Sequence, residues 1–268
     1  MKDLKNMIPT VLITGAAGNM GSAFCEKYAR KNYRVGLIDI DELRTQKLLK
    51  KLANPDLGHF AISRFNISST KGINKLFASI PSDSSLKILI NNAAGNAKSY
   101  SAKDSIEERW DKTINNDLKH IYLLTERAVV DMREHGGSIV NISSIAGNVL
   151  GSKSVPYAAA KSAIIGLTKS FARIYGSYNI RVNAILPGVI QSERTIESNK
   201  TGYFTEIKNQ TPMKRWGHPS EIAEAVYFIS SDKCNFINGS SLIIDGGSTL
   251  TLGQRIDEPL PFKWEKFS

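Results

Sequence analysis

Short runs of apolar, often β-branched residues alternate along the chain with longer stretches in which apolar residues recur every three or four positions. The short runs are typical of buried strands, and the longer periodic stretches are typical of amphipathic helices. We therefore predict strands over residues 10–14, 33–39, 60–65, 86–91, 137–143, 180–185 and 241–244. We predict helices over residues 19–31, 41–53, 70–79, 105–133, 156–177 and 219–230.

This alternation of strand and helix predicts the fold class. We expect an α/β protein with a single-domain doubly wound Rossmann fold, in which a seven-stranded parallel sheet carries helices on both faces. A length of 268 residues and a hydrophobic content of 41% agree with one domain over residues 1–268. We find no internal repeat and no low-complexity linker that would divide it.

Composition narrows the class of protein further. The chain has no run of about 18 apolar residues and no apolar signal core at its start, so we expect no membrane span and a cytoplasmic location. The two cysteines, Cys25 and Cys234, form no motif, and we expect Cys25 to be a buried apolar residue of the first helix. The four histidines show no metal-ligand spacing, so we predict no metal site.

The net charge of +10 comes from basic residues that fall at helical spacings among apolar ones. Lys27, Arg30 and Lys31 form one such group, which is typical of a solvated helix face. A nucleic-acid-binding protein is expected to carry a recognisable module as well, and we find none, so we predict no nucleic-acid partner. The charge could instead attract an anionic substrate.

Tyr157 and Lys161 are four residues apart in a predicted helix and therefore lie on one face of it. A lysine ammonium near a tyrosine hydroxyl stabilises the phenolate, which lets the pair exchange a proton near neutral pH. Ser144, thirteen residues before the tyrosine, has a hydroxyl that can hydrogen-bond a reacting oxygen. The same Tyr-x-x-x-Lys spacing occurs on ordinary exposed helices, so its meaning depends on the rest of the chain.

A glycine-rich turn, Gly15 to Gly21, separates the first predicted strand from the first predicted helix. Such a turn points backbone N–H groups and a helix N-terminus at a pyrophosphate, although a plain tight turn is an alternative. The second predicted strand ends at Asp39, whose carboxylate can accept from ribose hydroxyls and would repel a 2′-phosphate. This favours NAD over NADP. Asp41 is a second candidate for that role, and Asp39 could instead cap the next helix.

With these features in place, residues 8–249 resemble the short-chain dehydrogenase/reductase family. Its landmarks follow in order: the Thr14–Gly21 loop, Asn91-Asn92-Ala93-Ala94, the set Ser144, Tyr157 and Lys161, the Asn183–Gly188 turn, and Asp245-Gly246-Gly247. Asn19 replaces the middle glycine of the loop, and we expect the turn to tolerate it because asparagine adopts left-handed backbone readily. The resemblance implies that NAD(H) is bound by Gly15, Asn19, Met20, Gly21, Asp39, Asn66, Ile67, Asn92, Ala93, Ala94, Tyr157, Lys161, Pro187, Gly188, Ile190 and Ser192.

The resemblance also assigns catalysis to Ser144, Tyr157 and Lys161. The family usually has an asparagine in a phrase like Asn-Leu-x-Gly, where it helps to hold a water that links the lysine to solvent. Aligning this chain on Leu118 places Asp117 there. An aspartate can still accept a hydrogen bond from that water or from the lysine, so we predict that Asp117 substitutes in the proton relay.

A second departure from the family lies near the expected adenine site. Asn66 stands where the family usually has an aspartate. Its side-chain carbonyl can still hydrogen-bond the base. We therefore expect cofactor binding to survive this change.

The resemblance implies an NAD(H)-dependent oxidoreductase that interconverts a secondary alcohol and a ketone. A polar or anionic small-molecule substrate is favoured by a set of polar side chains around the expected pocket, Asn148, Lys153, Gln191, Arg194 and Lys98. Two alternatives stay open. One is an NADPH-dependent enoyl- or dienoyl-type reductase, because residues 91–96 also resemble 2,4-dienoyl-CoA reductases. The other is a non-catalytic binding protein with the same fold.

Residues 193–218 interrupt the alternation and resemble the substrate lid of the family, although a surface insertion is an alternative. The C-terminal extension, residues 250–268, carries aromatic residues, and we expect it to dock on its own domain or on a neighbouring subunit. Family members commonly assemble through the helices predicted here at 105–133 and 156–177. We therefore expect a homodimer or homotetramer.

Overall fold

The computed structural model describes residues 7–95, 104–149, 152, 154–192, 196 and 203–251. Its strands form one parallel sheet in the order β3-β2-β1-β4-β5-β6-β7. The strands are β1 (Ile8–Thr14), β2 (Arg34–Ile38), β3 (Phe60–Ile62), β4 (Ser84–Asn91), β5 (Gly137–Ile142), β6 (Ile180–Pro187) and β7 (Ser241–Ile244). The predicted fold class is confirmed.

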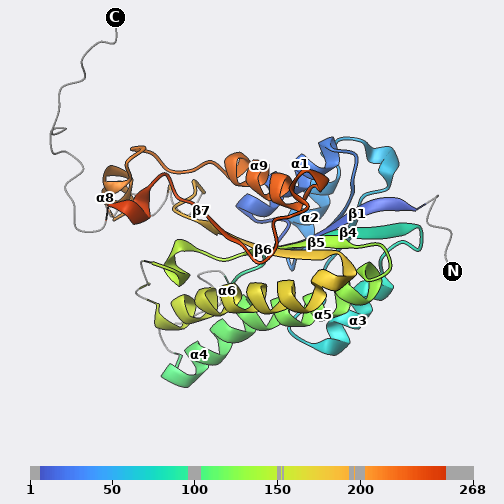
Figure 1. Ribbon diagram of the computed structural model, residues 1–268, viewed down its shortest axis with the longest axis horizontal. Coiled ribbons are helices and arrows are strands. Elements are labelled where there is room, and N and C mark those ends of the chain that lie inside the picture. Colours follow the sequence, from blue (N-terminus) through green and yellow to red (C-terminus); the bar gives the residue numbers. More distant parts are fainter. Residues whose placement is uncertain are drawn as a thin grey trace, which may run out of the picture.

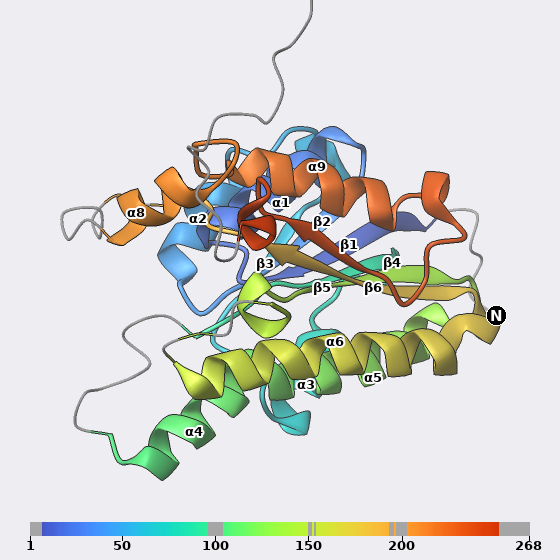
Figure 2. The same ribbon diagram turned by 60° about the vertical axis from the view of Figure 1, so that its left-hand side comes forward.

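Helices cover both faces of this sheet (Figure 1). They are α1 (Asn19–Arg30), α2 (Glu42–Leu49), α3 (Thr70–Ala78), α4 (Ile106–Ile114), α5 (His120–Met132), α6 (Val155–Tyr175), α8 (Tyr203–Gln210) and α9 (Pro219–Ser230). One hydrophobic core lies between the sheet and α1, α2 and α9, and a second lies between the sheet and α3, α5 and α6 (Figure 2).

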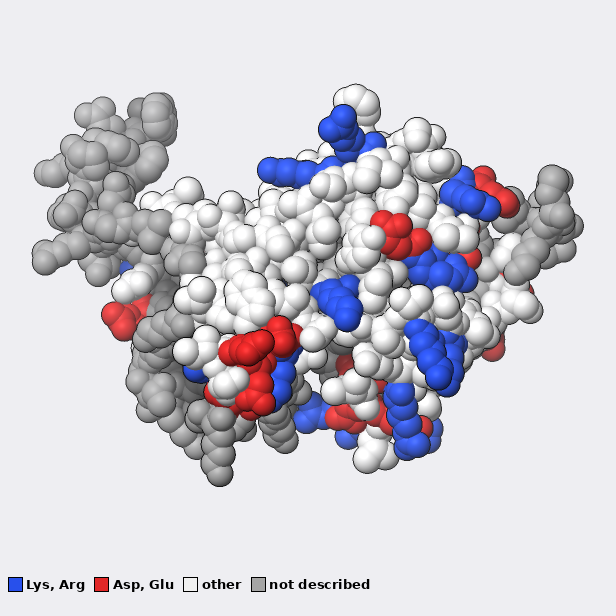
Figure 3. Space-filling view, turned by 90° about the horizontal axis from the view of Figure 1, so that it is seen from below, with Lys and Arg blue, Asp and Glu red and all other residues white. Residues whose placement is uncertain are grey.

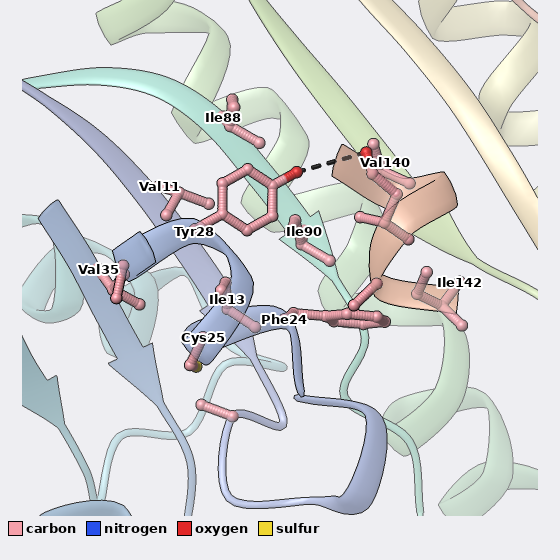
Figure 4. Packing of buried hydrophobic residues seen from close by; sticks show 14 of the residues in the cluster. Val11, Ile13, Phe24, Cys25, Tyr28, Val35, Ile88, Ile90, Val140 and Ile142 are labelled. Carbon is pink, nitrogen blue, oxygen red and sulfur yellow. Dashed lines mark hydrogen bonds between the residues drawn. The ribbon is translucent and has the colours of Figure 1, made fainter. Parts of the chain in front are cut away.

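The first core is packed around an aromatic residue of α1. The ring of Tyr28 lies among Val11, Ile88 and Ile90, which belong to the two central strands (Figure 4). Its hydroxyl is 2.6 Å from the hydroxyl of Ser230 at the end of α9, so the polar end of the ring is satisfied inside the core. This contact joins α1 to α9. Cys25, which lies in the same core, is fully buried as predicted.

The predicted elements occur in the predicted order, but several boundaries differ. The strand predicted at 60–65 ends at Ile62, because Arg64 adopts a left-handed φ of 68° that a strand does not allow. The helix predicted at 41–53 ends at Leu49. The helix predicted at 105–133 is interrupted by a π-helical turn, η4 (Asn115–Lys119), which separates α4 from α5. Such turns occur frequently at functional sites.

Helix α8 lies within the segment 193–218, where the sequence pattern did not predict a helix. Residues 193–195 and 197–202 of that segment lie outside the described residues, as do residues 252–268 of the C-terminal extension. Across the described part of the chain, every helix is too short or too polar to cross a bilayer.

Candidate active site

The order of the strands reverses between β1 and β4, and the loops that follow these two strands are bound to each other. The Thr14 hydroxyl oxygen accepts hydrogen bonds from the backbone N–H groups of Asn92 and Ala93, each at 2.9 Å. The Asn92 side-chain amide donates to the carbonyls of Thr14 (3.0 Å) and Gly15 (3.1 Å). A reversal of this kind leaves a crevice at the carboxyl ends of the strands, where open α/β sheets bind ligands.

The glycine-rich turn after β1 is packed too closely for larger residues. Gly15 has a φ of 64°, a conformation that residues with a side chain rarely adopt. A Cβ atom on Gly21 would lie 2.0 Å from the Gly15 carbonyl oxygen. The turn tolerates Asn19, but not for the predicted reason, because Asn19 is the first residue of helix α1 and has no left-handed backbone. Its side-chain amide instead donates to the carbonyl of Gln191, across the cleft described below.

Asp39 follows β2 and is bound to the glycine-rich turn. One carboxylate oxygen accepts from the backbone N–H of Ala17 at 2.9 Å, and the other accepts from the N–H of Asp41 at 3.0 Å. The cap of helix α2 is Asp41, whose side chain accepts from the N–H of Arg44. Asp39 therefore binds the glycine-rich turn, whereas Asp41 caps helix α2.

A cleft of about 1140 Å³ opens at this reversal point. It is large enough for a dinucleotide, since it exceeds the usual size of small-ligand pockets. Eleven of the predicted cofactor residues line it, namely Gly15, Asn19, Met20, Asp39, Asn66, Ile67, Asn92, Ala93, Ala94, Ile190 and Ser192.

The other predicted cofactor residues do not line this cleft. A Cβ atom on Gly188 would lie 2.8 Å from the Cα of Asp245, so Gly188 allows the loop after β6 to pass close to the loop after β7. Pro187 ends β6, and Gly21 packs against the glycine-rich turn. Neither Tyr157 nor Lys161 borders the cleft described above.

The cleft also contains residues that sequence reasoning missed. Arg44 and Arg64 lie at its β2–β3 side, where each forms an ion pair with an acid of the α2 region, Asp41 and Glu42 respectively. Asn66 lies on the same side, and its side-chain carbonyl accepts from the backbone N–H of Ser68 at 2.9 Å. Both arginines are largely exposed and could approach a phosphate only by giving up these acidic partners.

Helix α6 carries Tyr157 and Lys161. Lys161 is buried, and its ammonium donates to the carbonyl of Ile142 at the end of β5, at 3.1 Å. The same ammonium lies 5.6 Å from the centre of the Tyr157 ring. The Tyr157 hydroxyl makes no hydrogen bond to any described residue, so it is available to a ligand.

Ser144 lies in the loop between β5 and α6, just before the short 3-10 helix η5 (Ile145–Gly147). The segment from Ser143 to Gly147 is fixed against α6 by two hydrogen bonds, from the Ser143 hydroxyl to the Lys161 carbonyl (2.7 Å) and from the Ser162 hydroxyl to the Gly147 carbonyl (2.6 Å). The loop that carries Ser144 and the helix that carries Tyr157 therefore form one packed unit.

The π-helical turn brings two further polar residues to this unit. Asp117 is buried, and one of its carboxylate oxygens accepts from the backbone N–H of Gly95, which follows β4. His120 is fully buried and borders the cleft; neither ring nitrogen makes a well-formed hydrogen bond, and the backbone of Ala93 is at most a weak partner. Burial and, secondarily, the charge of Lys161 lower the pKa of His120 to about 3, although the nearby backbone of Ala93 opposes the shift. The ring is therefore neutral at neutral pH.

The sequence contained a signal for His120. In the phrase Asp117-Leu118-Lys119-His120, the histidine stands where the family phrase Asn-Leu-x-Gly has its glycine. Of the polar residues expected around a substrate, Asn148 and Gln191 are exposed near the site, whereas Lys98, Lys153 and Arg194 lie outside the described residues. Within the residues that the structure describes, no group of three or more His, Cys, Asp or Glu side chains is placed to hold a metal.

Comparison with known proteins relates this geometry to a family. The family model described as Enoyl-(Acyl carrier protein) reductase matches residues 15–249. An NAD-dependent glycerol dehydrogenase from Listeria innocua is 34% identical over 250 residues, which cover 93% of this chain and 97% of that protein.

Two solved structures have a fold similar to that of this chain. A protein from Agrobacterium tumefaciens, assigned provisionally as a gluconate dehydrogenase, has a TM-score of 0.81 at 27% identity and covers 92% of this chain and 98% of its own. An acetoin dehydrogenase from Enterobacter cloacae has a TM-score of 0.76 at 26% identity and covers 96% of this chain and 99% of its own.

Proposed function

The chain belongs to the short-chain dehydrogenase/reductase family and is an oxidoreductase, and from this premise we propose that it interconverts a secondary alcohol and a ketone with NAD(H). The observation that carries the proposal is the packed unit of β5, η5 and α6, which holds Ser144 and Lys161 together with a Tyr157 hydroxyl that has no partner among the described residues. A nicotinamide cofactor supplies or accepts the hydride when it is bound.

The residues of the cleft fit such a cofactor. Gly15 and Gly21 allow the close approach of backbone that a pyrophosphate needs, and the N-terminus of α1 follows directly. Asp39 is already oriented by two backbone N–H groups, and a carboxylate oxygen can accept more than one hydrogen bond, so it can receive the ribose hydroxyls as well. The side chains named above as cleft lining would hold the rest of the dinucleotide.

The chemistry of the chain's own residues follows from their positions. In reduction, Tyr157 donates a proton to the carbonyl oxygen, and in oxidation it takes one from the alcohol. Lys161 stabilises the phenolate by its positive charge, and Ser144 hydrogen-bonds the substrate oxygen so that it faces the tyrosine. Asp117 takes the place of the family's asparagine on the path that links Lys161 to solvent.

The cofactor preference depends on Asp39. A 2′-phosphate placed near this carboxylate would be repelled, and the carboxylate cannot turn away because the turn at Ala17 holds it. Arg44 and Arg64 are the groups that could offset this repulsion, but both are paired with acids. These contacts support NAD over NADP.

A second candidate function is the reduction of a carbon–carbon double bond with NADPH. It is favoured by the description of the family model, which names an enoyl reductase. Asp39 is the feature that opposes it. A non-catalytic binding protein would need neither the tyrosine nor the lysine, so the retained set Ser144, Tyr157 and Lys161 opposes that alternative.

A binding titration tests the proposal first. We expect purified protein to bind NADH tightly and NADPH much more weakly, as measured by nicotinamide fluorescence. Glycerol, gluconate and acetoin, the polar compounds named for similar proteins, form the first panel for turnover. Preference for NADPH would favour the double-bond reductase, and absence of binding to either cofactor would favour the non-catalytic protein.

We also propose that the chain forms a homodimer or homotetramer through the face covered by α5 and α6. Large apolar side chains are exposed on these helices, including Tyr122, Val130 and Ile174. Charged side chains of both signs are scattered over this side of the molecule, and uncharged surface lies between them (Figure 3). Light scattering of Val130→Lys should show smaller particles than the parent protein if this face is the interface.

The segment 193–218 is proposed as the lid over the substrate. Its described part includes α8 and the stretch up to Gly217, whose N–H and carbonyl bond to Val189 and Gln191 beside the cleft. This attachment beside the cleft supports the proposal, because a lid has to act at the edge of the site that it covers.

A further inference from the structure

A row of buried polar side chains crosses the α5/α6 face of the sheet. It links Asn91 of β4, Asn141 of β5 and Thr168 of α6, each of which is 0% exposed. The Asn91 side-chain amide donates to the side-chain carbonyl of Asn141 (2.8 Å) and to the Thr125 hydroxyl oxygen of α5 (3.3 Å). The Asn141 amide donates to the Thr168 hydroxyl oxygen (3.0 Å), and the Thr168 hydroxyl donates to the Ile164 carbonyl (2.8 Å). The row therefore joins two strands to the helix that carries Tyr157.

The row lies at the carboxyl ends of its two strands, beside the candidate site. Asn91 and Asn141 are register partners in the sheet. Leu89 and Ile139, which are also register partners, lie two residues earlier on the same face and belong to the apolar core. Polar side chains therefore replace apolar ones where the strands reach the site. Because hydrogen bonds are directional, this polar row fixes how the elements are oriented, which apolar contacts do less strictly.

Three successive residues at the end of β5 bind α6. Asn141 binds Thr168 as described, and the Ile142 carbonyl accepts from the Lys161 ammonium at 3.1 Å. The Ser143 hydroxyl donates to the Lys161 carbonyl at 2.7 Å. Thr168 is seven residues after Lys161, so it lies on nearly the same face and about 10 Å farther along the helix axis. Two attachments at this separation fix the tilt of α6 as well as its position.

The attachment at Thr168 affects the geometry of the proposed reaction. Tyr157 lies one turn before Lys161, so a helix held at Lys161 alone could pivot there and carry the tyrosine with it. Ser144 does not move with α6, because it follows the residues of β5 that hold the helix. A misplacement of about 1 Å can lower a reaction rate by about 10²-fold. The spacing between the Ser144 and Tyr157 hydroxyls therefore depends on both attachments.

We propose that Asn141 and Thr168 are positioning residues for the proposed reaction. Their hydrogen bond sets the orientation of α6 on β5 and thereby the spacing between the Ser144 and Tyr157 hydroxyls. Neither residue lines the cleft, so both act through the residues that they position. This inference rests on the proposed function, because the spacing matters only if these two hydroxyls share a substrate oxygen.

Thr168→Val tests the link at the helix. It keeps the shape of the side chain and removes the oxygen that accepts from Asn141. We expect the turnover number to fall by about 10–10²-fold, whereas KM and NADH affinity should stay within a few-fold of the parent values. Thr168→Ser keeps the hydroxyl and should retain turnover close to that of the parent. The substrate is whichever of glycerol, gluconate and acetoin the parent turns over.

Thr45→Val is the matched control. Thr45 is also 0% exposed, and its hydroxyl also donates to the carbonyl four residues earlier, that of Asp41, at 2.6 Å. It lies on α2, on the opposite face of the sheet from α6 (Figure 2). The same substitution should therefore lower stability there and leave turnover at the parent value. Equal losses of turnover in the two variants would overturn the proposal.

A double variant separates positioning from stability. Thr168→Val leaves the Asn141 amide without its acceptor, so urea unfolding should shift to lower concentration. Combining it with Asn141→Leu removes both groups of this bond, so the double variant should lose less stability than the sum of the single losses. Its turnover should stay as low as in the worse single variant. Turnover that recovers together with stability would show a packing role and overturn the proposal. If Thr168→Val does not fold, the double variant decides.

Crystal structures of the parent and of the folded variant give a measure that needs no substrate. We expect the distance between the Ser144 and Tyr157 hydroxyl oxygens to differ by about 1 Å between them. An unchanged distance would overturn the positioning role. Parent-like turnover in a folded Thr168→Val, together with an inactive Tyr157→Phe, would overturn it as well. Parent-like turnover in Tyr157→Phe, or a parent that binds neither nicotinamide cofactor, would instead overturn the proposed function.

Discussion

The two walls of the cleft satisfy their polar groups in different ways. On the wall formed by the loops after β1, β2 and β4, Thr14, Asn92 and Asp39 each make at least two hydrogen bonds within the fold. The other wall is formed by η4 and the start of α5, and α6 packs against η4 outside the cleft. On this side, the Tyr157 hydroxyl makes no hydrogen bond with the described residues, and the His120 ring makes no well-formed one. The first wall is therefore preorganised for binding, and the second keeps polar groups available for ligands and water.

The largest effect should come from Tyr157 on α6, which packs beside the second wall. Tyr157→Phe removes a hydroxyl that supports no contact among the described residues, so stability and NADH affinity should stay close to the parent values. Turnover should fall by about 10²–10⁴-fold, because the acid/base group is lost. Steady-state kinetics with an active member of the panel would measure this. Tyr178→Phe, at an exposed tyrosine outside the site, is the control and should keep parent turnover.

On the first wall, a change at Thr14 should act on stability. Thr14→Val leaves the N–H groups of Asn92 and Ala93 without their acceptor, so the free energy of unfolding should fall by about 1–3 kcal/mol. Thr10→Val, on the same strand, removes only a local bond to the Ile8 carbonyl and should have a smaller effect. Urea denaturation of both variants measures the difference, and equal losses would contradict the special role of Thr14.

Asp39 tests whether the first wall selects the cofactor. Asp39→Asn removes the charge and one acceptor, so NADH affinity should fall roughly 10–100-fold, as expected for hydrogen bonds to a charged group. NADPH affinity should fall less or should rise. Asp41→Asn is the matched control, since asparagine also caps helices well, and its cofactor preference should stay as in the parent. If Asp39→Asn keeps the parent's preference for NADH over NADPH, other residues discriminate between the two cofactors.

A dependence of stability on pH should be absent at neutral pH and should develop only as the pH falls. The folded-state pKa of His120 is lowered to about 3, below its ordinary value of 6.5, so the unfolded chain takes up a proton at a pH where the folded chain does not. Stability from this group is complete above pH 6.5 and falls as pH decreases toward 3, by about 1.4 kcal/mol per pH unit. His120→Asn should lack this component. Parallel pH curves for parent and variant would contradict the assignment.

Much of the fold could be predicted from the sequence because strand and helix periodicities are local properties. The glycine-rich turn and the Tyr157–Lys161 spacing were also readable, since each depends on residues close together in the chain. The sequence did not predict which of Asp39 and Asp41 would bind the glycine-rich turn and which would cap α2, because this depends on which acid reaches the N–H of Ala17. The catalytic and cofactor roles themselves stay predictions.

The π-helical turn shows why the rest could not be predicted. The hydrophobic pattern continues through residues 105–133 with helical spacing, so it does not reveal an inserted wide turn at Asn115–Lys119. The partners of Asp117 and His120 come from β4 and α6, which are distant in sequence. The family phrase therefore marked Asp117 and His120 as unusual residues, but it did not reveal the burial of His120 or the partners of either residue.

The bonds around Thr14 also affect how a ligand can leave. They continue the pairing of β1 with β4 beyond the last backbone ladder bond, so these two loops cannot separate without breaking them. At the opposite rim, the Asn19 amide donates to the Gln191 carbonyl, and both residues are exposed. Exchange of a bound dinucleotide should therefore occur through this rim, and its dissociation rate should be set there rather than at the strands.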